Sequence, residues 1–374
     1  MRKAMIYPFS ARCLPLTLYF SKFQPEYSIS ALLSPVGLGL FRRTPFYAAN
    51  RTGESDLLVQ CEIEVALKQC DALIVPYGDY KNDPSFYNAI DVIHCAVAMG
   101  KEIFCCLPLR KPQRKEIENA CQIYGATWHN GFQESFNIFN RISYGNYKAH
   151  VPVVFVHDLG IEADSFEITL SLTNKFIRDG YKVSTVGPNP EYNILGFHGS
   201  SLLLSMLYGY EKLRNVPQFI KKLKFYMHMI EVNENPDVIL FHCPGAAVPM
   251  DQLFQNDSGV YTYLVSRAIR PDFSLVCMAY STPSDESIRS IHTELDYQFG
   301  FGIDALHLSN CTLHVETTKF TGAEQHVFIP EESALETAYN MRLKGQNNIP
   351  IFCALNESDQ EQLYAYITNI LGAL

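Results

Sequence analysis

Histidine and cysteine side chains near the ends of expected strands have the clearest capacity for chemistry in this sequence. His198 lies in a glycine- and serine-rich loop, and His242 and Cys243 close a strongly apolar strand. Open α/β sheets bind ligands at the carboxyl ends of their strands, where an imidazole can act as acid or base. A thiol beside an imidazole can ionise near neutral pH and attack an electrophile. We therefore predict these three as catalytic candidates, the alternatives being a turn histidine and a buried, hydrophobic cysteine.

A second group of candidates could bind a ligand, mostly in the loop after the apolar run at 152–156. Its members are carboxylate, hydroxyl and glycine positions in loops or turns: Asp158, Gly160, Glu162, Asp164, Ser165, Gly245 and Asp304. The residues from Ser165 onward fit a helix that ends at Gly180, followed by a strand at 182–187. This order predicts the opening βαβ unit of an α/β domain.

The loop resembles the phosphate-binding loop of P-loop nucleotide-binding proteins with its phosphate-binding residues replaced. That loop has the pattern G-x-x-x-x-G-K-[ST], whose backbone and lysine hold phosphates and whose hydroxyl binds Mg²⁺. Counting back from Gly180 puts Ser165 at the lysine position and Phe166 at the hydroxyl position. The later strand ends in His242 and Cys243 instead of an acidic magnesium ligand. The resemblance implies a degenerate P-loop-like scaffold without ordinary NTP hydrolysis.

Acidic residues in the same loop have two further interpretations. His157, Asp158, Glu162 and Asp164 could ligate a metal, but they lack the histidine spacing of known metal motifs, and we predict no metal site. The carboxylates fit the start of a helix better, with Asp164 or Ser165 as the N-cap. We make no prediction of a cofactor.

The alternation of short apolar runs with helical periodicity predicts two α/β domains, each with a Rossmann-like parallel sheet, at 1–150 and 151–374. In the first, we expect strands at 3–9, 27–35, 70–80 and 102–109, and helices at 61–70, 86–101 and 114–125. In the second, after the opening βαβ unit, we expect strands at 235–243, 273–280, 303–310 and 348–353, and helices at 216–234, 259–269 and 285–300. The dinucleotide pattern G-x-G-x-x-G does not follow the first strand. The stretch 135–150 is the expected bridge.

Composition narrows the function classes. The chain has 374 residues, 47% of them hydrophobic and 18% charged, and a net charge of −9 without a long basic run, so we expect neither nucleic-acid nor membrane binding. The 11 cysteines are scattered and contain no C-x-x-C, which favours reduced thiols. The start of the sequence lacks a signal-peptide pattern. We therefore expect a cytoplasmic protein.

Several stretches together resemble the family described as peptide maturation system proteins. They are 3–9, 164–170, 196–198, 243–245 and 299–304. The family occurs mainly in clostridia and related Firmicutes, beside genes for a small cysteine-rich, bacteriocin-like precursor and a radical SAM maturase. The resemblance implies a role in making a ribosomally synthesised, post-translationally modified peptide (RiPP), a natural product, and it implies no assigned catalytic residues.

Three hypotheses follow for function. The first is an accessory protein that binds the precursor peptide, its radical SAM maturase, or both. The second is an enzyme that uses the strand-end His198, His242 and Cys243 to modify the peptide or a small molecule. The third is a divergent nucleotide-binding regulator, because a cleft can hold a nucleotide without the lysine.

Overall fold

The computed structural model describes residues 1–78, 83–86, 88–133, 147–161, 163–200, 202–203, 215–249, 258–321, 325–344 and 348–373. Contacts divide the chain into two compact units, Met1–Ser135 with Asn189–Ser201, and Phe136–Pro188 with Leu202–Leu374. This division differs from the predicted ranges 1–150 and 151–374. The first unit ends earlier, and it includes a segment from the middle of the sequence. The predicted bridge at 135–150 lies largely outside the described residues.

Unit 1 is built on a parallel sheet. Its strands are β1 (Arg2–Ile6), β2 (Tyr27–Leu33), β3 (Val59–Gln60), β4 (Ala72–Val75), β5 (Glu102–Cys105) and β6 (Thr127–Asn130). They run in the order β3-β2-β1-β4-β5-β6, and all the neighbouring strands pair in parallel. This is the strand order of the Rossmann dinucleotide-binding fold. Sequence periodicity did not predict the short β3 or β6.

Helices cover both faces of this sheet. They are α1 (Leu14–Phe23), α2 (Pro45–Ala48), α3 (Ile63–Gln69), α4 (Ala89–Ala98) and α5 (Lys111–Tyr124), with the short α7 (Glu191–Ile194) and β9 (His198–Gly199) in the later segment. The helices α3, α4 and α5 pack into one cluster with Ile103 and Cys105 of β5. On the opposite face Phe20 of α1 meets Phe104, with ring centroids 5.3 Å apart. Side chains alternate along a strand, so one strand serves both layers.

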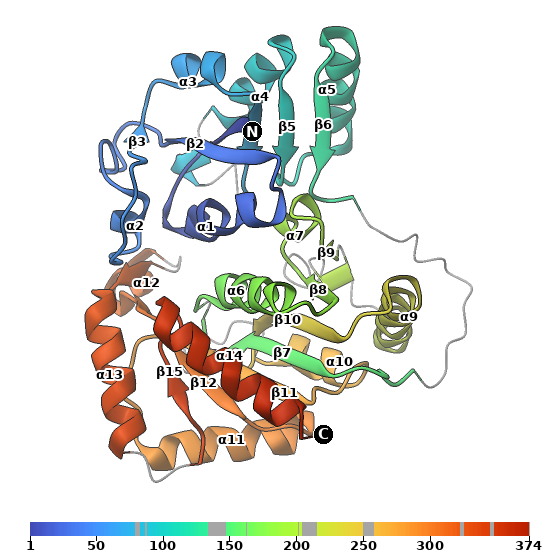
Figure 1. Cartoon of the computed structure of the whole chain (residues 1–374), viewed down its shortest axis with the longest axis vertical. Helices are drawn as coiled ribbons and strands as arrows, with labels where there is room; N and C mark the ends of the chain where they lie inside the picture. The colour runs from blue at the N-terminus through green and yellow to red at the C-terminus, as the bar shows by residue number, and fades with distance from the viewer. Residues whose placement is uncertain are drawn as a thin grey trace. The chain divides into compact units, whose positions relative to one another are not determined.

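Unit 2 is built on a second parallel sheet (Figure 1). Its strands are β7 (Val153–Asp158), β8 (Val183–Gly187), β10 (Val238–Ala246), β11 (Phe273–Met278), β12 (Ala305–Leu308) and β15 (Ile351–Phe352). Within this unit they run in the order β15-β12-β11-β7-β10-β8, with parallel pairing throughout. The expectation of two parallel-sheet α/β units is confirmed.

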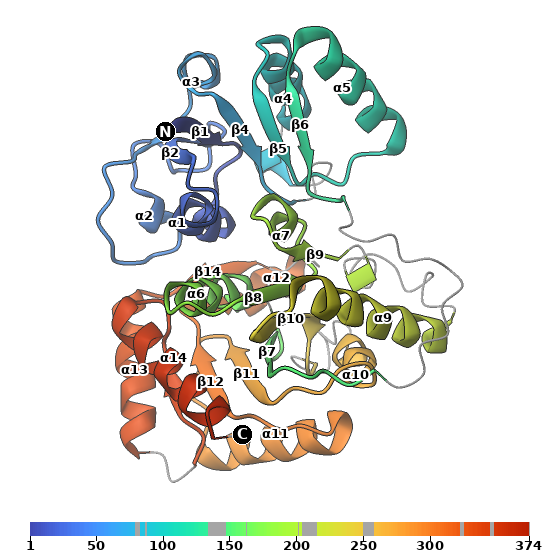
Figure 2. The ribbon, with the colours of Figure 1, turned by 45° about the vertical axis from the view of Figure 1, so that its right-hand side comes forward.

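Two helical layers enclose the second sheet, and both can be followed in Figures 1 and 2. The helices are α6 (Ser165–Arg178), α9 (Val216–Glu234), α10 (Val260–Ser266), α11 (Asp285–Phe299), α12 (Val315–Thr321), α13 (Glu331–Lys344) and α14 (Glu357–Leu371). One face packs against α6 and α14, and the other against α9, α10, α11 and α13. Burial on both faces explains the continuous apolar run of β7.

A small antiparallel ribbon follows β12 and was not predicted. It consists of β13 (Cys311–Leu313) and β14 (His326–Phe328). Its strands are too short to show a hydrophobic alternation in the sequence. In the described residues, no helix is long and apolar enough to cross a membrane.

Candidate functional site

The turn from β7 into α6 is the centre of the candidate site. Asp158 is the last residue of β7, and Ser165 is the first residue of α6. Asp164 occupies the N-cap position with a left-handed backbone, φ 67°, and its side chain makes no capping hydrogen bond. The predicted N-cap position is therefore right, but the carboxylate is directed to other partners.

Asp158 binds the donors of its own loop. One carboxylate oxygen accepts the backbone N–H of Ala163 at 2.8 Å, and the other accepts the hydroxyl of Ser165 at 2.6 Å. The side chain is buried, at 6% exposure. In a P-loop, backbone N–H groups and the first turn of the helix face a phosphate. Here a carboxylate of the same chain takes that place.

His242 joins this group through Ser165. Its Nε2 lies 2.9 Å from the Ser165 hydroxyl oxygen. Because the single hydroxyl proton goes to Asp158, Nε2 of His242 must carry the proton that it shares with Ser165. Burial, and secondarily His157, lower the pKa of His242 to about 3, which keeps the imidazole neutral. The order carboxylate–hydroxyl–imidazole differs from a Ser-His-Asp triad, in which the imidazole stands in the middle.

A second group of polar side chains holds Asp164. Ser309 donates its hydroxyl to Asp164 Oδ2 at 2.5 Å, and Nε2 of His307 lies 3.4 Å from the same oxygen. Nδ1 of His307 accepts the backbone N–H of Ala354 at 3.1 Å, so the ring N–H is on Nε2, facing the carboxylate. Sequence analysis missed His307 and Ser309. The available signal was a pair of polar residues near the end of the strand predicted at 303–310.

The sheet topology explains why these residues meet. The chain leaves β7 toward β8 on one side of the sheet and leaves β11 toward β12 on the other. Neighbouring strands whose connections diverge open a crevice at their carboxyl ends, which is where α/β sheets bind ligands. At this position the backbone N–H of Leu159, which follows β7, donates to the carbonyl of Cys277 in β11 at 2.8 Å.

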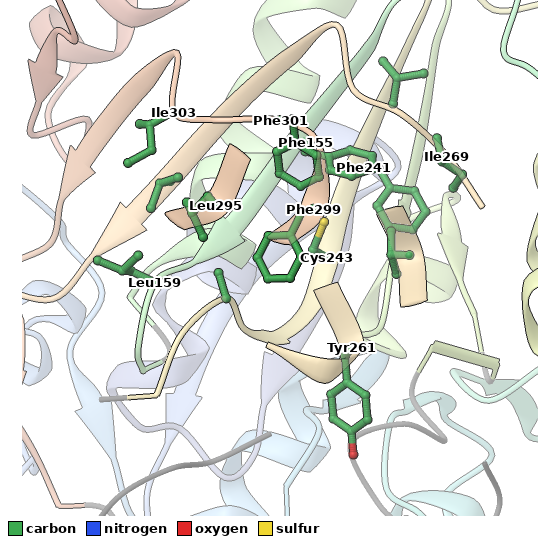
Figure 3. Close-up of a cluster of buried hydrophobic side chains, with 14 of the residues drawn as sticks. Phe155, Leu159, Phe241, Cys243, Tyr261, Ile269, Leu295, Phe299, Phe301 and Ile303 are labelled. Carbon is green, nitrogen blue, oxygen red and sulfur yellow. The ribbon is translucent and has the colours of Figure 1, made fainter. Parts of the chain in front are cut away.

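Cys243 is not part of this group. Successive strand residues face opposite sides, so Cys243 lies in the cluster of Phe155, Phe241 and Phe299 (Figure 3), whereas His242 contacts Ser165 of α6. The thiol is 1% exposed, and burial raises its pKa well above the ordinary value. His242 and Cys243 therefore do not form a thiol–imidazole pair with each other.

The remaining ligand-binding candidates have separate positions. Gly245 has φ 71° beside Ala246, which pairs with Asp158, so it lies at the site. Gly160 lies in the site loop, and Glu162 lies outside the described residues. Asp304 lies at the amino end of β12, away from the carboxyl ends of the strands, and accepts the N–H of Ser274 at 2.7 Å.

His198 belongs to unit 1, whereas His242 and Cys243 belong to unit 2. It lies in β9 and is buried, at 6% exposure. The next residue, Gly199, donates its N–H to the side chain of Asn193 at 2.9 Å. The site described above therefore consists of residues of unit 2 alone.

Unit 1 also has a carboxylate at the carboxyl end of its sheet. Glu191 of α7 accepts the backbone N–H of Tyr77, just after β4, at 2.6 Å. The pKa of Cys106, which follows β5, is raised mainly by burial and secondly by the negative charge of Glu191. Asn193 donates to the carbonyl of Gly131 at 2.6 Å, and Gln24 donates to that of Ile194 at 2.9 Å. These contacts explain why 189–201 belongs to unit 1.

The carboxylates of the candidate site in unit 2 do not form a metal-binding cluster with other described side chains. Within the described part of the chain, no group of three or more His, Cys, Asp or Glu residues could hold a metal ion. The buried Asp158 and the partly buried Asp164 instead accept hydrogen bonds from hydroxyl and N–H donors.

Comparison with known proteins shows a likeness of fold. No family model and no curated protein matches the chain. The structure is similar to that of a DUF1611 family protein from Anabaena variabilis, with a TM-score of 0.64 and 13% identity over 99% of this chain and 100% of the other. At this identity the likeness shows the fold alone.

Two further solved structures match with low scores. One is a GTPase from Pyrococcus abyssi in its apo form, with a TM-score of 0.29 and 15% identity over 58% of this chain and 96% of that one. The other is chloroplast FtsY from Physcomitrella patens, with a TM-score of 0.30 and 14% identity over 78% and 83%. These scores carry no argument about this chain. The resemblance to the peptide maturation family stays a prediction.

Proposed function

We propose that this protein is a binding module without NTP hydrolysis that serves as an accessory protein in the maturation of a ribosomally synthesised, modified peptide. Its partner is the precursor peptide or the radical SAM maturase. The absence of hydrolysis is supported by the structure of the β7–α6 loop. The peptide partner is supported by the sequence resemblance.

The observation that carries the proposal is the position of the Asp158 carboxylate. It accepts the Ala163 N–H and the Ser165 hydroxyl, which are the donors that a bound phosphate would need. A phosphate charge about 4 Å from a carboxylate is repelled by about 4 kcal/mol at the effective dielectric constant of a protein surface. That energy weakens binding by roughly a thousandfold. The loop therefore binds its own anion and disfavours a polyphosphate.

The enzyme hypothesis has one specific observation in its favour, the 2.9 Å contact between Ser165 and His242. The geometry does not suit a serine nucleophile, because the hydroxyl proton is donated to Asp158 and Ser165 is fully buried. The pKa of His242, about 3, also makes the imidazole a weak base. A binding role is therefore the better interpretation of this site.

Calorimetric titration tests the proposal directly. The purified protein is titrated with ATP and GTP, with and without Mg²⁺, and in parallel with the precursor peptide encoded beside its gene and with the maturase. We expect binding of the peptide or the maturase and no nucleotide binding at micromolar concentrations. Micromolar nucleotide binding would overturn the loop argument and favour the regulator hypothesis. Binding of neither the peptide nor the maturase would overturn the accessory role.

The variant Asp158→Asn separates the two parts of the proposal. Removal of the charge should leave peptide binding unchanged, because Asp158 is buried and held by its own loop. If peptide binding falls with the charge while the fold persists, the loop itself is the peptide site. The structural role assigned to Asp158 would then be wrong.

A further inference from the structure

Most cysteines described by the structure are poor candidates for thiol chemistry. Burial raises the pKa of Cys13 to about 11 and the pKa values of Cys105 and Cys353 to about 12. Burial also raises the pKa values of Cys243 and Cys277 well above the ordinary value. Thiols in such surroundings stay protonated and unreactive.

Cys311 differs from these cysteines because its side chain contacts an imidazole. Its Sγ lies 3.3 Å from Nδ1 of His326. In the ribbon, Cys311 lies opposite Phe328 and Leu313 opposite His326, so Cys311 and His326 are diagonal neighbours on one face. A thiol–imidazole contact of the kind expected near Cys243 thus occurs elsewhere in unit 2.

The ribbon places this pair next to the candidate site. The backbone N–H of Cys311 donates to the Ser309 hydroxyl oxygen at 2.8 Å, and the same hydroxyl donates to Asp164 at 2.5 Å. The N–H of Tyr280, which follows β11, donates to the carbonyl of Cys311 at 2.7 Å. Cys311 therefore lies at the carboxyl end of the parallel sheet of unit 2, the edge where α/β sheets bind ligands.

We propose that Cys311 and His326 form a thiol–disulfide exchange site whose substrate is a disulfide of a small molecule or peptide. His326 takes the proton of the Cys311 thiol, and the thiolate attacks one sulfur of the substrate. The substrate S–S bond breaks as a bond between Cys311 and the attacked sulfur forms. The second sulfur leaves with the electron pair and receives the proton from His326. The product is a mixed disulfide on Cys311, and no other oxidant is needed.

A disulfide fits this pair better than a thioester does. Attack on a carbonyl carbon develops an oxyanion, which needs fixed hydrogen-bond donors. The N–H of Cys311 itself is already donated to Ser309. Attack on sulfur develops no oxyanion and needs only the thiolate and a proton for the leaving sulfur.

Access to Cys311, which is 4% exposed, comes through opening of the ribbon. Its strands are three residues each, and two-stranded ribbons are only marginally stable on their own. Such elements open locally at low free-energy cost. His326 is half-buried and its Nε2 is a buried atom, so the same opening must expose both members of the pair.

The test measures mixed-disulfide formation with oxidised glutathione in the full-length, reduced protein. Peptide mapping by mass spectrometry follows Cys311 and, as an internal reference, the exposed Cys95 of α4. At about pH 6 an unassisted thiol is only roughly 0.3% ionised. We expect Cys311 to react at least about tenfold faster than Cys95 at this pH. If Cys311 reacts more slowly than Cys95 at both about pH 6 and about pH 8, the proposal is overturned.

Two histidine variants and a second reagent complete the test. His326→Gln should remove the advantage of Cys311 and leave Cys95 unchanged, whereas His314→Gln, an exposed histidine bonded to Thr317, should change neither rate. An unchanged Cys311 rate in folded H326Q would refute the role of the imidazole. If a small aryl thioester modifies Cys311 and oxidised glutathione does not, the substrate class is wrong. If H326Q does not fold, the comparison of Cys311 with Cys95 in the unaltered protein still decides.

Discussion

Replacement of Asp158 by asparagine should destabilise unit 2, because the carboxylate holds the β7–α6 loop. It accepts the Ala163 N–H and the Ser165 hydroxyl in a buried position just before α6. A hydrogen bond to a charged acceptor contributes about 1.5–3 kcal/mol, and a negative charge at a helix N-terminus contributes about 0.3–1 kcal/mol. An amide can keep one bond but turns its NH₂ group toward the other donor. We expect a loss of about 2–4 kcal/mol in the free energy of unfolding.

Urea unfolding measures this loss, with far-UV circular dichroism as the signal. The single tryptophan, Trp128, lies in β6 of unit 1, so its fluorescence reports on the other unit in the same experiment. The expected result is an earlier circular-dichroism transition with little change in Trp128 fluorescence. The matched control is Asp304→Asn, which removes the charge from a carboxylate that accepts the N–H of Ser274 at the amino end of β12. We expect that control to cost no more than about 1 kcal/mol.

A double-mutant cycle sharpens the test. Asp158→Asn and Ser165→Ala, alone and combined, should show a coupling energy of about 1–2 kcal/mol, because each residue bonds to the other. A loss below about 0.5 kcal/mol for D158N, or a coupling within the usual error of about 0.3–0.5 kcal/mol, would refute the reasoning. The loop would then be held by its backbone, and Asp158 would be no surrogate for a phosphate.

Two further predictions concern other buried groups. His157 and His242 have folded-state pKa values of about 4 and about 3, below the unfolded value of about 6.5. Between the folded and unfolded pKa values the unfolded chain binds more protons than the folded chain. The free energy of unfolding should therefore fall as the pH falls through this range. At about pH 5 each histidine should lower the free energy of unfolding by about 2 kcal/mol relative to neutral pH. His242→Gln should therefore flatten the pH dependence of the unfolding free energy measured in urea. An unchanged pH dependence would contradict the assignment. Glu191→Ala should leave the Tyr77 N–H without its 2.6 Å acceptor and cost unit 1 about 1–3 kcal/mol, seen as an earlier Trp128 transition and faster amide exchange at Tyr77, whereas equal exchange rates would show that the carboxylate is dispensable.

The layers of the fold were predictable because their signals are local. The run at 152–156, the helix from Ser165 and the strand before Gly187 follow one another in the sequence, and each appears in the structure as β7, α6 or β8. Apolar periodicity and the turn at Gly180 suffice for such a unit. The order of the strands in the sheet depends on pairing between distant segments, and local periodicity does not reveal it.

The site was only partly predictable for the same reason. Asp158 and Ser165 were found because the loop pattern is continuous in the sequence. Ser309 contacts Asp164 over a sequence separation of 145, a contact that exists only once β12 has taken its place in the sheet. The separation of His242 from Cys243 was available from the sequence, since neighbouring residues of a strand face opposite sides.

Both units place a carboxylate of their own on a backbone N–H at the carboxyl edge of a parallel sheet. In unit 2 Asp158 accepts the N–H of Ala163, and in unit 1 Glu191 accepts the N–H of Tyr77. Loops and helix N-termini at such an edge present unpaired donors and a positive field, which nucleotide-binding proteins satisfy with a bound phosphate. A chain without the glycines and lysine for a phosphate must still satisfy the same donors, because a buried N–H without an acceptor costs about 1–3 kcal/mol. An internal carboxylate meets that requirement permanently, and in unit 2 Asp158 does so for Ala163 and Ser165. Removal of the carboxylate should therefore destabilise the loop rather than open a nucleotide site.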